Sequence, residues 1–371
     1  MHTTNILIIG AGPAGLGMAG RLSHAGKEYT IIEASDRIGV AWHNHYDRLH
    51  LHTVKQWSHL PHMPFPDDYP LYVSRHQLTE YFESYAKHFN INPIFNQEVR
   101  EIKKVEDSYH VSTVDQSYEA QQVIIATGVN RIPNIPHWKG QDSFTGEVVH
   151  SRYYKNPKPY IGKKVLVVGM GNTGAEVALD LSEHEVDTTI AVRSPISVVP
   201  RDLNGQPVQV TSKRLAKIPF GIGDWLGSQI RKVYFGNLEQ YGLRVSPLHP
   251  AQQLRETGKT PIVDIGTIAA IKEGLIRVKP NIKEIKGDQV KFEDGSTSSI
   301  DVILLATGYR AKIEEFFPDV VNFLDENYLP QEPVGTSALK GAYFLGYDNY
   351  KLGGILGTIL TDTQTILNDI I

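Results

Sequence analysis

Residues 5–33, NILIIGAGPAGLGMAGRLSHAGKEYTIIE, decide the fold. The apolar run at 6–9 predicts a buried strand, and a glycine turn at 10–15 follows it. A second short strand ends at Glu33. Between turn and strand, a helix with one buried face is indicated by the spacing of Leu16, Ala19 and Leu22. This order of strand, glycine turn, helix and strand predicts a βαβ unit.

The same order returns further along the chain, at residues 163–193, KKVLVVGMGNTGAEVALDLSEHEVDTTIAVR. The first glycines of the two turns, Gly10 and Gly169, are 159 residues apart (169 − 10). A chain of 371 residues is also long enough for two separate cores. We therefore predict an α/β protein with two dinucleotide-binding, Rossmann-like domains.

Two Ala-Thr-Gly turns, at 126–128 and 306–308, each close an apolar strand in a similar position relative to a glycine turn. If the second of them closes the second domain, the chain beyond it returns to the first. We therefore predict a discontinuous first domain, 1–158 plus 306–371, and a second domain, 159–305.

The segments between these units are less regular. Residues 40–75 are rich in Pro and aromatic residues, which favours an irregular packed loop, and 78–89 is typical of an amphipathic helix. The segment 155–163, KNPKPYIGK, is expected to be an exposed connector between domains. For 195–265, punctuated by Pro and Gly, we predict no detailed structure.

Composition excludes several classes of function. There are 37 Lys and Arg against 41 Asp and Glu, a net charge of −4, with no long basic run for a phosphate backbone, so nucleic acid is not an expected partner. The chain has no cysteine, which removes disulfides, thiolate metal sites and redox dithiols. No signal peptide or membrane-spanning stretch is apparent, so we expect a soluble, cytoplasmic protein.

The first glycine turn has the residues that a dinucleotide needs. Gly10 permits the tight turn, Gly12 lets the backbone approach a pyrophosphate, and Gly15 lets helix and strand pack closely. Glu33 follows Gly15 by 18 residues, near the ~20 expected for an acid that binds ribose hydroxyls.

The second turn repeats the pattern with Gly169, Gly171 and Gly174, but its second strand ends in Arg193-Ser194. A cation there suits an additional 2′-phosphate, whereas an acid would repel it, so we predict NADPH in preference to NADH. The alternative is that Arg193 is an ordinary surface arginine.

Between the turns, residues 142–154, DSFTGEVVHSRYY, resemble the FxGxxxHxxx(W/Y) fingerprint of class B flavin monooxygenases. The fingerprint positions are Phe144, Gly146, His150 and Tyr154. Four further stretches are similar to the plant YUCCA family of flavin monooxygenases, so that the resemblance covers nearly the whole chain. They are YDRLHLHTVKQWSHLPHMPFPDDYP (46–70), VRSPISVVPRD (192–202), GKTPIVDIGTIAAIKEGLIRV (258–278) and VILLATGYR (302–310).

The resemblance implies a glutathione-reductase-like flavoprotein architecture, with FAD bound by the first domain, NADPH by the second, and O2 as co-substrate. In the family, NADPH reduces the flavin, and oxygen adds to it as a C4a-(hydro)peroxide that transfers one oxygen atom. Trp42 would lie near the flavin. Further cofactor contacts are expected from Ala14, Arg37, Ala126, Thr127, Gly128, Asn172, Thr173, Ser194, Thr307 and Gly308.

His52, His150 and Tyr154 are the catalytic candidates. His52 stands where animal-type flavin monooxygenases carry an asparagine, and a flavin-side role and a packed loop histidine are both open. For His150 we favour a hydrogen-bonding hinge over proton transfer, and Tyr154 would wall an aromatic pocket or pack in the core. The histidine-rich stretch 43–62 lacks a metal-binding pattern. Arg48 and Lys55 are anion partners or surface charges.

The resemblance points to oxidative decarboxylation of an aromatic 2-oxo acid such as indole-3-pyruvate. Oxygenation of a sulfide or amine, or Baeyer–Villiger insertion into a ketone, are alternatives within the same class. A different class is an NADPH–flavin reductase that inserts no oxygen. The expected partners are therefore a small-molecule substrate and O2, and a homodimer is left open.

Overall fold

The computed structural model describes residues 1–215, 222–348, 350–351 and 353–370. Its contacts divide the chain into two compact units. The first unit holds 1–44, 49–132 and 309–371, and the second unit holds 45–48 and 133–308. Each unit is described by itself below.

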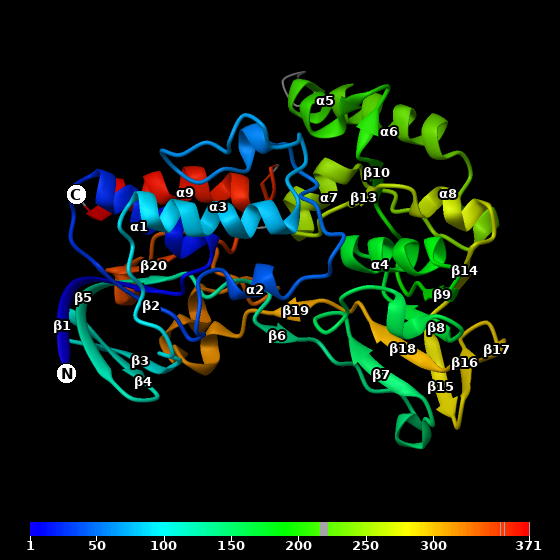
Figure 1. The fold of residues 1–371 in the computed structure, drawn as a ribbon, viewed down its shortest axis with the longest axis horizontal. Coiled ribbons are helices and arrows are strands. Elements are labelled where there is room, and N and C mark those ends of the chain that lie inside the picture. The colour runs from blue at the N-terminus through cyan, green and yellow to red at the C-terminus, as the bar shows by residue number, and fades with distance from the viewer. Residues whose placement is uncertain (216–221, 349, 352, 371) are drawn as a thin grey trace. The chain divides into compact units, whose positions relative to one another are not determined.

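The first unit is built on a six-stranded sheet in the order β2-β1-β5-β4-β3, with β20 also paired to β5 (Figure 1). The strands β1, β2, β5 and β20 run parallel, whereas β3 and β4 are antiparallel. The buried residues of β1, Ile6 to Ile9, are the apolar run seen in the sequence. The strands are β1 (His2–Ile9), β2 (Thr30–Ile32), β3 (Val99–Val105), β4 (Ser108–Thr113), β5 (Ser117–Ile125) and β20 (Ala342–Phe344).

Three helices pack together in this unit: α1 (Pro13–His24), α3 (Arg75–His88) and α9 (Gly354–Ile370). Leu16, Ala19 and Leu22 of α1 are completely buried in this core, as the spacing predicted. Helix α3 begins at a capping box, in which Ser74 and Gln77 each accept a hydrogen bond from the other's backbone N–H. Shorter helical turns are α2 (Val40–His43), η1 (Lys55–Trp57), η5 (Ile313–Glu315), η6 (Pro318–Phe323) and η7 (Ser337–Leu339).

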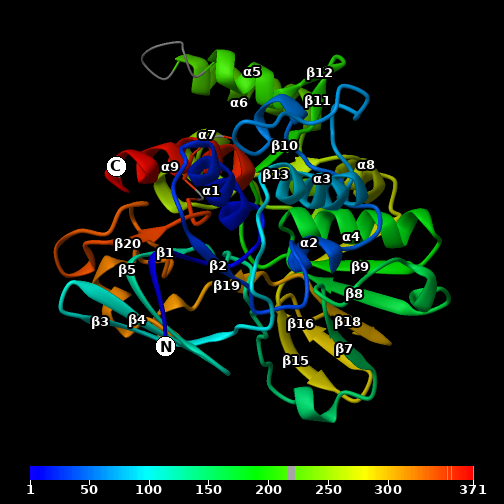
Figure 2. The same ribbon diagram turned by 60° about the vertical axis from the view of Figure 1, so that its left-hand side comes forward.

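The second unit is built on a five-stranded parallel sheet in the order β14-β9-β8-β18-β7. Helix α4 (Asn172–Glu183) packs on β8 and β9, and Figure 2 shows it lying across them. Helix α8 (Thr267–Lys272) packs beside α4. The strands are β7 (Glu147–His150), β8 (Lys164–Val168), β9 (Asp187–Ala191), β14 (Ile276–Lys279) and β18 (Val302–Leu305).

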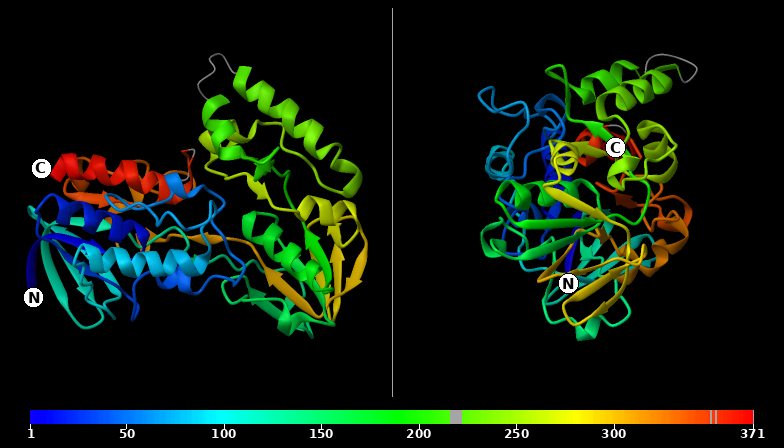
Figure 3. Two further views of the ribbon diagram at one scale, coloured as in Figure 1. Left: turned by 45° about the horizontal axis from the view of Figure 1, so that its top comes forward. Right: turned by 90° about the vertical axis from the view of Figure 1, so that its right-hand side faces the viewer.

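The region 195–265, for which we predicted no structure, adds small strands and helices to the second unit. Helices α5 (Val208–Leu215) and α6 (Ile222–Phe235) pack against each other, as Figure 3 shows. The other elements there are β10 (Val198–Pro200), β11 (Asp202–Leu203), β12 (Gln206–Pro207), η4 (Glu239–Tyr241), α7 (Pro250–Thr257) and β13 (Ile262–Asp264). A three-stranded sheet, β15 (Ile282–Lys286), β16 (Gln289–Phe292) and β17 (Thr297–Ser299), and the turns η2 (Gln141–Ser143) and η3 (Lys158–Tyr160) complete the unit.

The two units divide at 132/133 and 308/309, whereas the predicted boundaries were 158/159 and 305/306. The reason is that β7 pairs with β18 in the sheet of the second unit. The segment 155–163 consequently lies inside the second unit and does not connect the two. The connecting chain includes the short strands β6 (Ile132–Pro133) and β19 (Tyr309–Arg310).

Within the described residues, no helix combines the length and the apolar character needed to cross a membrane.

Candidate dinucleotide-binding sites

The first glycine turn follows β1 directly. Gly10 has φ +110°, and its N–H donates to the Ile32 carbonyl at 2.8 Å. A Cβ on Gly10 would lie 2.5 Å from the Ala126 carbonyl oxygen, and one on Gly15 would lie 1.8 Å from the carbonyl oxygen of Gly10. Both positions therefore exclude a side chain, because β1, α1 and the end of β5 meet there.

Gly12 differs from these two glycines. It is the N-cap of α1, and a Cβ there would meet no atom of the described residues within 4 Å. No side chain of the described residues caps the helix, so the first-turn amides, including those of Ala14 and Gly15, remain available to an anion. This open, donor-rich helix start fits a pyrophosphate.

Glu33 is held beside the turn by its carboxylate. The Ala11 N–H donates to its Oε2 at 2.7 Å, and Ser35 donates to its Oε1 from both the backbone N–H (2.9 Å) and the hydroxyl (2.8 Å). An ionised carboxylate has acceptor positions beyond these three. Glu33 is therefore fixed in orientation beside the first glycine turn, with acceptor positions left over.

Arg37 and Trp42 lie in the segment after Glu33. Arg37 is exposed and pairs with the adjacent Asp36 at 3.0 Å. Trp42 belongs to α2, whose N-cap Gly39 donates its N–H to the Ala11 carbonyl at 3.0 Å, so α2 starts at the glycine turn. The Trp42 ring is half-buried and meets Phe82 edge-on at 6.3 Å.

The turn Ala126-Thr127-Gly128 ends β5 beside the glycine turn. The Thr127 hydroxyl shares a 2.7 Å hydrogen bond with the hydroxyl of Tyr347, a buried residue of the C-terminal segment. Burial raises the pKa of Tyr347 to about 12, so the phenol stays protonated at neutral pH. Sequence reasoning missed Tyr347, because it stands 220 positions from its partner and in no motif.

His52 lies in the loop 51–54 of the first unit and is half-buried. Its neighbour Thr53 shares a 2.7 Å hydrogen bond with Ser58 and faces the start of α9, where a Cβ on Gly354 would lie 3.4 Å from Thr53 Cγ2. Lys55 donates to the carbonyl oxygens of Asp67 (2.8 Å) and Tyr69 (2.6 Å), so it stabilises the loop.

The second glycine turn repeats the first. Gly169 has φ +100°, and a Cβ there would lie 2.7 Å from the Ala306 carbonyl oxygen. A Cβ on Gly174 would lie 2.0 Å from the Gly169 carbonyl oxygen, whereas the space at Gly171, the N-cap of α4, is open. The second unit therefore offers the same kind of helix start to a second pyrophosphate.

Two residues predicted to contact the second cofactor, Asn172 and Thr307, use their side chains in hydrogen bonds to the protein backbone. Asn172 Nδ2 donates to the Pro261 carbonyl at 3.2 Å, and its Oδ1 accepts from the Val263 N–H at 2.7 Å. The Thr307 hydroxyl donates to the Asn134 carbonyl at 2.5 Å. Thr173 is half-buried in the first turn of α4, and Gly308 has φ +80°.

Arg193 and Ser194 follow β9 and are both exposed. Arg244 lies beside them: its Nη2 donates to the Arg193 carbonyl at 2.5 Å, and its own carbonyl accepts from the Ile196 N–H at 2.8 Å. In the part of the chain that the structure describes, no carboxylate pairs with either guanidinium. Sequence reasoning missed Arg244, because no local pattern links it to a residue 51 positions earlier.

His150 is buried and held on both ring nitrogens. The Arg152 N–H donates to Nδ1 at 3.1 Å, so Nδ1 carries no proton, and Nε2 then donates to the Gly308 carbonyl at 3.2 Å. Burial lowers the pKa of His150 below its usual value, which also favours the neutral ring. This geometry ties β7 to the turn after β18 within the second unit, so His150 does not lie in the connector between the units.

Tyr154 is fully buried, and its hydroxyl donates to Asp180 Oδ2 at 2.6 Å. Burial raises the pKa of Tyr154 far above its usual value. Arg48 pairs with two carboxylates of α4, because its Nη1 donates to Asp180 (3.2 Å) and to Glu183 (2.6 Å). Tyr46 donates to Glu176 at 2.7 Å one turn earlier on the same helix. The segment 45–48 and Tyr154 thus supply one cation and two hydroxyl donors to the acidic face of α4.

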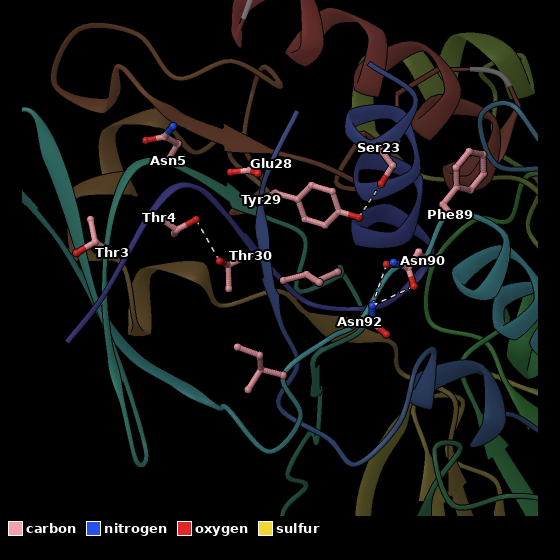
Figure 4. Close-up of a pocket in the computed structure, with 12 residues that line it drawn as sticks. Thr3, Thr4, Asn5, Ser23, Glu28, Tyr29, Thr30, Phe89, Asn90 and Asn92 are labelled. Carbon is pink, nitrogen blue, oxygen red and sulfur yellow. Dashed lines mark hydrogen bonds between the residues drawn. The ribbon is translucent and has the colours of Figure 1, made fainter. Parts of the chain in front are cut away.

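A cavity of about 860 Å³ lies at the start of β1, at the end of the strand away from the glycine turn (Figure 4). Its polar groups pair with one another: Tyr29 with Ser23 at 2.9 Å, and Thr30 with Thr4 at 3.1 Å. None of the residues that line this cavity belongs to either glycine turn. Among the described residues, no three His, Asp or Glu side chains are grouped as metal ligands.

Two glycine turns of this geometry, one in each α/β unit, are typical of a protein that binds two dinucleotides. The chain matches the family model "Pyridine nucleotide-disulphide oxidoreductase" over residues 7–218. It is 34% identical, over 98% of its own length and 86% of the relative's, to the probable indole-3-pyruvate monooxygenase YUCCA3 of Arabidopsis thaliana. It is 36% identical to the indole-3-pyruvate monooxygenase YUCCA6 of the same plant, over 95% of the chain and 87% of the relative.

Solved structures agree on the fold. The flavin-containing monooxygenase from Stenotrophomonas maltophilia has a TM-score of 0.76 at 19% identity, covering 100% of this chain and 98% of that one. Cyclohexanone monooxygenase in its open form has a TM-score of 0.71 at 18% identity, covering 99% and 88%. The chain therefore belongs to the pyridine nucleotide-disulphide oxidoreductase family and, within it, to the YUCCA-type flavin monooxygenases. This membership confirms the predicted family and fold class, and with them an FAD- and NADPH-dependent oxidoreductase.

Proposed function

We propose that this monooxygenase converts an aromatic 2-oxo acid, such as indole-3-pyruvate, into the acid that is one carbon shorter. Two electrons from NADPH and one O2 are consumed. One oxygen atom enters the product acid, the other leaves as water, and the carboxyl carbon leaves as carbon dioxide. The observation that carries the proposal is that relatives named for indole-3-pyruvate align with 94–98% of the chain.

In this proposal the first unit holds FAD. The first-turn amides of α1, beside the open space at Gly12, would bind the pyrophosphate, and Glu33 would accept hydrogen bonds from the ribose. When bound, FAD accepts the hydride of NADPH and brings O2 into reaction. Trp42 on α2 and the Thr127–Tyr347 pair would form further parts of the flavin environment.

The second unit would hold NADPH in the same manner. The amides at the start of α4, beside Gly171, would bind its pyrophosphate. Arg193, Ser194 and Arg244 would surround the 2′-phosphate. Because Arg244 donates to the Arg193 backbone and no described carboxylate pairs with either guanidinium, two cations would be available to the 2′-phosphate dianion, which favours NADPH over NADH.

His52 is the chain's proposed electrostatic group on the flavin side. Its loop packs against the first turn of α9 through Thr53 and Gly354. As an imidazolium, it would stabilise negative charge that develops on oxygen during the reaction. His150 and Tyr154, in contrast, would act by holding β7 and α4 in place.

One experiment tests this function directly. The enzyme is reduced anaerobically with NADPH and, in parallel, with NADH. Oxygen is then admitted with indole-3-pyruvate, phenylpyruvate or no substrate, while the flavin spectrum, the acid product and carbon dioxide are measured. We expect a 2-oxo acid to accelerate oxygen uptake with stoichiometric product. Reoxidation that yields only hydrogen peroxide would identify a reductase instead, and a panel of sulfides, amines and ketones would reveal another oxygenation.

A cytoplasmic location and a homodimeric state are further parts of the proposal. Cell fractionation and light scattering test them independently of activity.

A further inference from the structure

Helix α6 carries a buried arginine on its inner face. Gly227, Arg231 and Phe235 follow one another at four-residue spacing and therefore share this face. A Cβ on Gly227 would lie 2.7 Å from the Nε2 atom of His249, so another segment covers the helix there. Phe235 is buried, and Arg231 is only 8% exposed. The guanidinium is therefore enclosed between two covered positions.

Within the described part of the chain, this guanidinium has no counter-charge. Among the residues that the structure describes, nothing forms a hydrogen bond or an ion pair with Arg231, and its Nη1 is fully buried without a partner. An arginine side chain keeps its proton at neutral pH even though burial lowers its pKa. A lone buried charge costs several kcal/mol, so folded proteins rarely keep one unless something else compensates it.

A second unpartnered group belongs to the same layer. Ser197 precedes β10, the strand on which α6 packs, and its buried hydroxyl also has no hydrogen-bond partner among the described residues. A cationic fork and a hydroxyl are the groups that recognise a carboxylate: the guanidinium donates two parallel hydrogen bonds, and the hydroxyl donates one more. No described residue supplies either group with an anion of this kind.

A cavity with aromatic and charged walls adjoins the end of α6. Its volume is about 410 Å³, and it is lined by Tyr234 and Phe235 together with Arg201, Asp202, Asp264, Ile265, Gly266, Ile268, Ala269 and Lys272. Phe235 is one helical turn beyond Arg231 on the same face, so an aromatic wall follows directly after the unpaired cation. The arrangement suits a molecule with an aromatic ring at one end and a carboxylate at the other.

We propose that Arg231 binds the carboxylate of an aromatic 2-oxo acid, with Tyr234 and Phe235 against the ring. The choice of a 2-oxo acid rests on the proposed function, whereas the choice of a carboxylate rests on the unpaired guanidinium. Arg231 would therefore determine which ketones are accepted, by favouring those that carry an acid group.

Two probes of the same skeleton test this site on the FAD-loaded enzyme. Phenylpyruvate has a carboxylate where phenylacetone has a methyl group, so calorimetric dissociation constants for the two isolate the contribution of the charge. We expect the unaltered protein to prefer phenylpyruvate. Arg231→Met should weaken the binding of phenylpyruvate by about 10- to 100-fold, the range for a lost charge-assisted hydrogen bond. It should leave the dissociation constant of phenylacetone unchanged.

Lys232→Met is the matched control, since it removes an exposed cation from the next position of α6 and should change neither constant. Arg231→Lys keeps the charge without the fork, should give an intermediate loss, and serves if the methionine variant does not fold. Without ligand, Arg231→Met should unfold at the same or a higher temperature, because an uncompensated charge is gone.

The inference is overturned if Arg231→Met and the unaltered protein bind phenylpyruvate equally. It is also overturned if Arg231→Met loses the binding of phenylpyruvate and of phenylacetone to the same extent. Equal binding accompanied by acid product and carbon dioxide would leave the proposed function standing. An unaltered enzyme that binds phenylpyruvate but never converts it would instead remove the proposed function and keep the site.

Discussion

The Tyr154 hydroxyl donates a 2.6 Å hydrogen bond to the carboxylate of Asp180, and both side chains are buried. Arg48 donates to the other oxygen of the same carboxylate at 3.2 Å. A buried charge is tolerated when it has a cation and a neutral donor of this kind. The last residue of the FxGxxxHxxx(W/Y) fingerprint is therefore part of the support for α4, the helix that begins at the second glycine turn.

This support role predicts a loss of stability in Tyr154→Phe. The substitution keeps the ring and removes one donor from a buried carboxylate, which costs about 1–3 kcal/mol. We expect a lower melting temperature and a similar rate of flavin reduction once the protein is folded. Thermal unfolding and stopped-flow reduction by NADPH measure the two quantities.

Tyr153→Phe is the control for this prediction, because Tyr153 precedes it in sequence and is 68% exposed. It should change neither quantity. A Tyr154→Phe enzyme with unchanged stability but a reduction rate lowered by orders of magnitude would instead make the phenol a catalytic group.

The glycines of the first turn should separate folding from FAD binding. A Cβ on Gly15 would lie 1.8 Å from backbone, so Gly15→Ala should prevent the turn and give insoluble or flavin-free protein. The space at Gly12 is open, so Gly12→Ala should fold and yet bind FAD at least about tenfold more weakly, because its methyl group occupies the approach of the pyrophosphate. Circular dichroism and fluorescence titration of the flavin-free protein check both outcomes, and equal FAD affinity in Gly12→Ala would contradict the assignment.

His150 predicts a pH dependence of stability with a defined sign. Burial lowers its pKa in the folded state, so between that pKa and the unfolded value of about 6.5 the unfolded chain binds more protons. Stability therefore falls as pH decreases from about 7 to about 5. Glutamine does not bind a proton in this pH range, so His150→Gln should lose less stability between pH 7 and pH 5. At pH 7 we expect this variant to be less stable than the unaltered protein.

Urea unfolding of both proteins at the two pH values tests this prediction. Comparing the differences is necessary because His43 and His62 also have lowered pKa values and titrate in both proteins. Parallel stability curves for the two proteins would show that His150 is protonated equally in the folded and unfolded states.

The sequence was informative wherever the physical requirement is local. The conflict between a side chain on Gly15 and the Gly10 carbonyl arises within one turn, and Leu16, Ala19 and Leu22 acquire their burial from helix periodicity. Such features fix two βαβ units, and the fold class followed from them. The resemblance to flavin monooxygenases, which covers nearly the whole chain, supplied the cofactors and the class of reaction.

What the sequence could not predict depends on contacts between distant positions. Tyr347 meets Thr127 across 220 residues, and Arg244 meets Arg193 across 51. From the sequence, Arg48 and Lys55 were expected to be anion partners or surface charges. No local pattern shows that Arg48 donates to carboxylates of α4 or that Lys55 donates to loop carbonyls. The boundary near 132 was missed for the same reason, since the pairing of β7 with β18 joins residues more than 150 positions apart.

The last prediction concerns the choice between the two nicotinamide dinucleotides. Arg193→Ala and Arg244→Ala should each weaken the binding of NADP⁺ by about tenfold or more, because only NADP⁺ carries the 2′-phosphate. The binding of NAD⁺ should be unchanged. Calorimetric titration measures both constants without turnover. Lys283→Ala, which removes an exposed cation from β15 on the separate three-stranded sheet, is the control for net charge.

Arg244→Gln separates two ways in which Arg244 could act. Its amide can still donate to the Arg193 carbonyl, as the guanidinium does at 2.5 Å, but it carries no charge. If Arg244 contacts the phosphate, the glutamine variant should bind NADP⁺ as weakly as the alanine variant. If Arg244 only holds the Arg193 backbone in place, glutamine should restore the affinity of the unaltered protein. A lower slope of NADP⁺ affinity against salt in both variants would support the first alternative, since each lost cation weakens the screened attraction to the dianion.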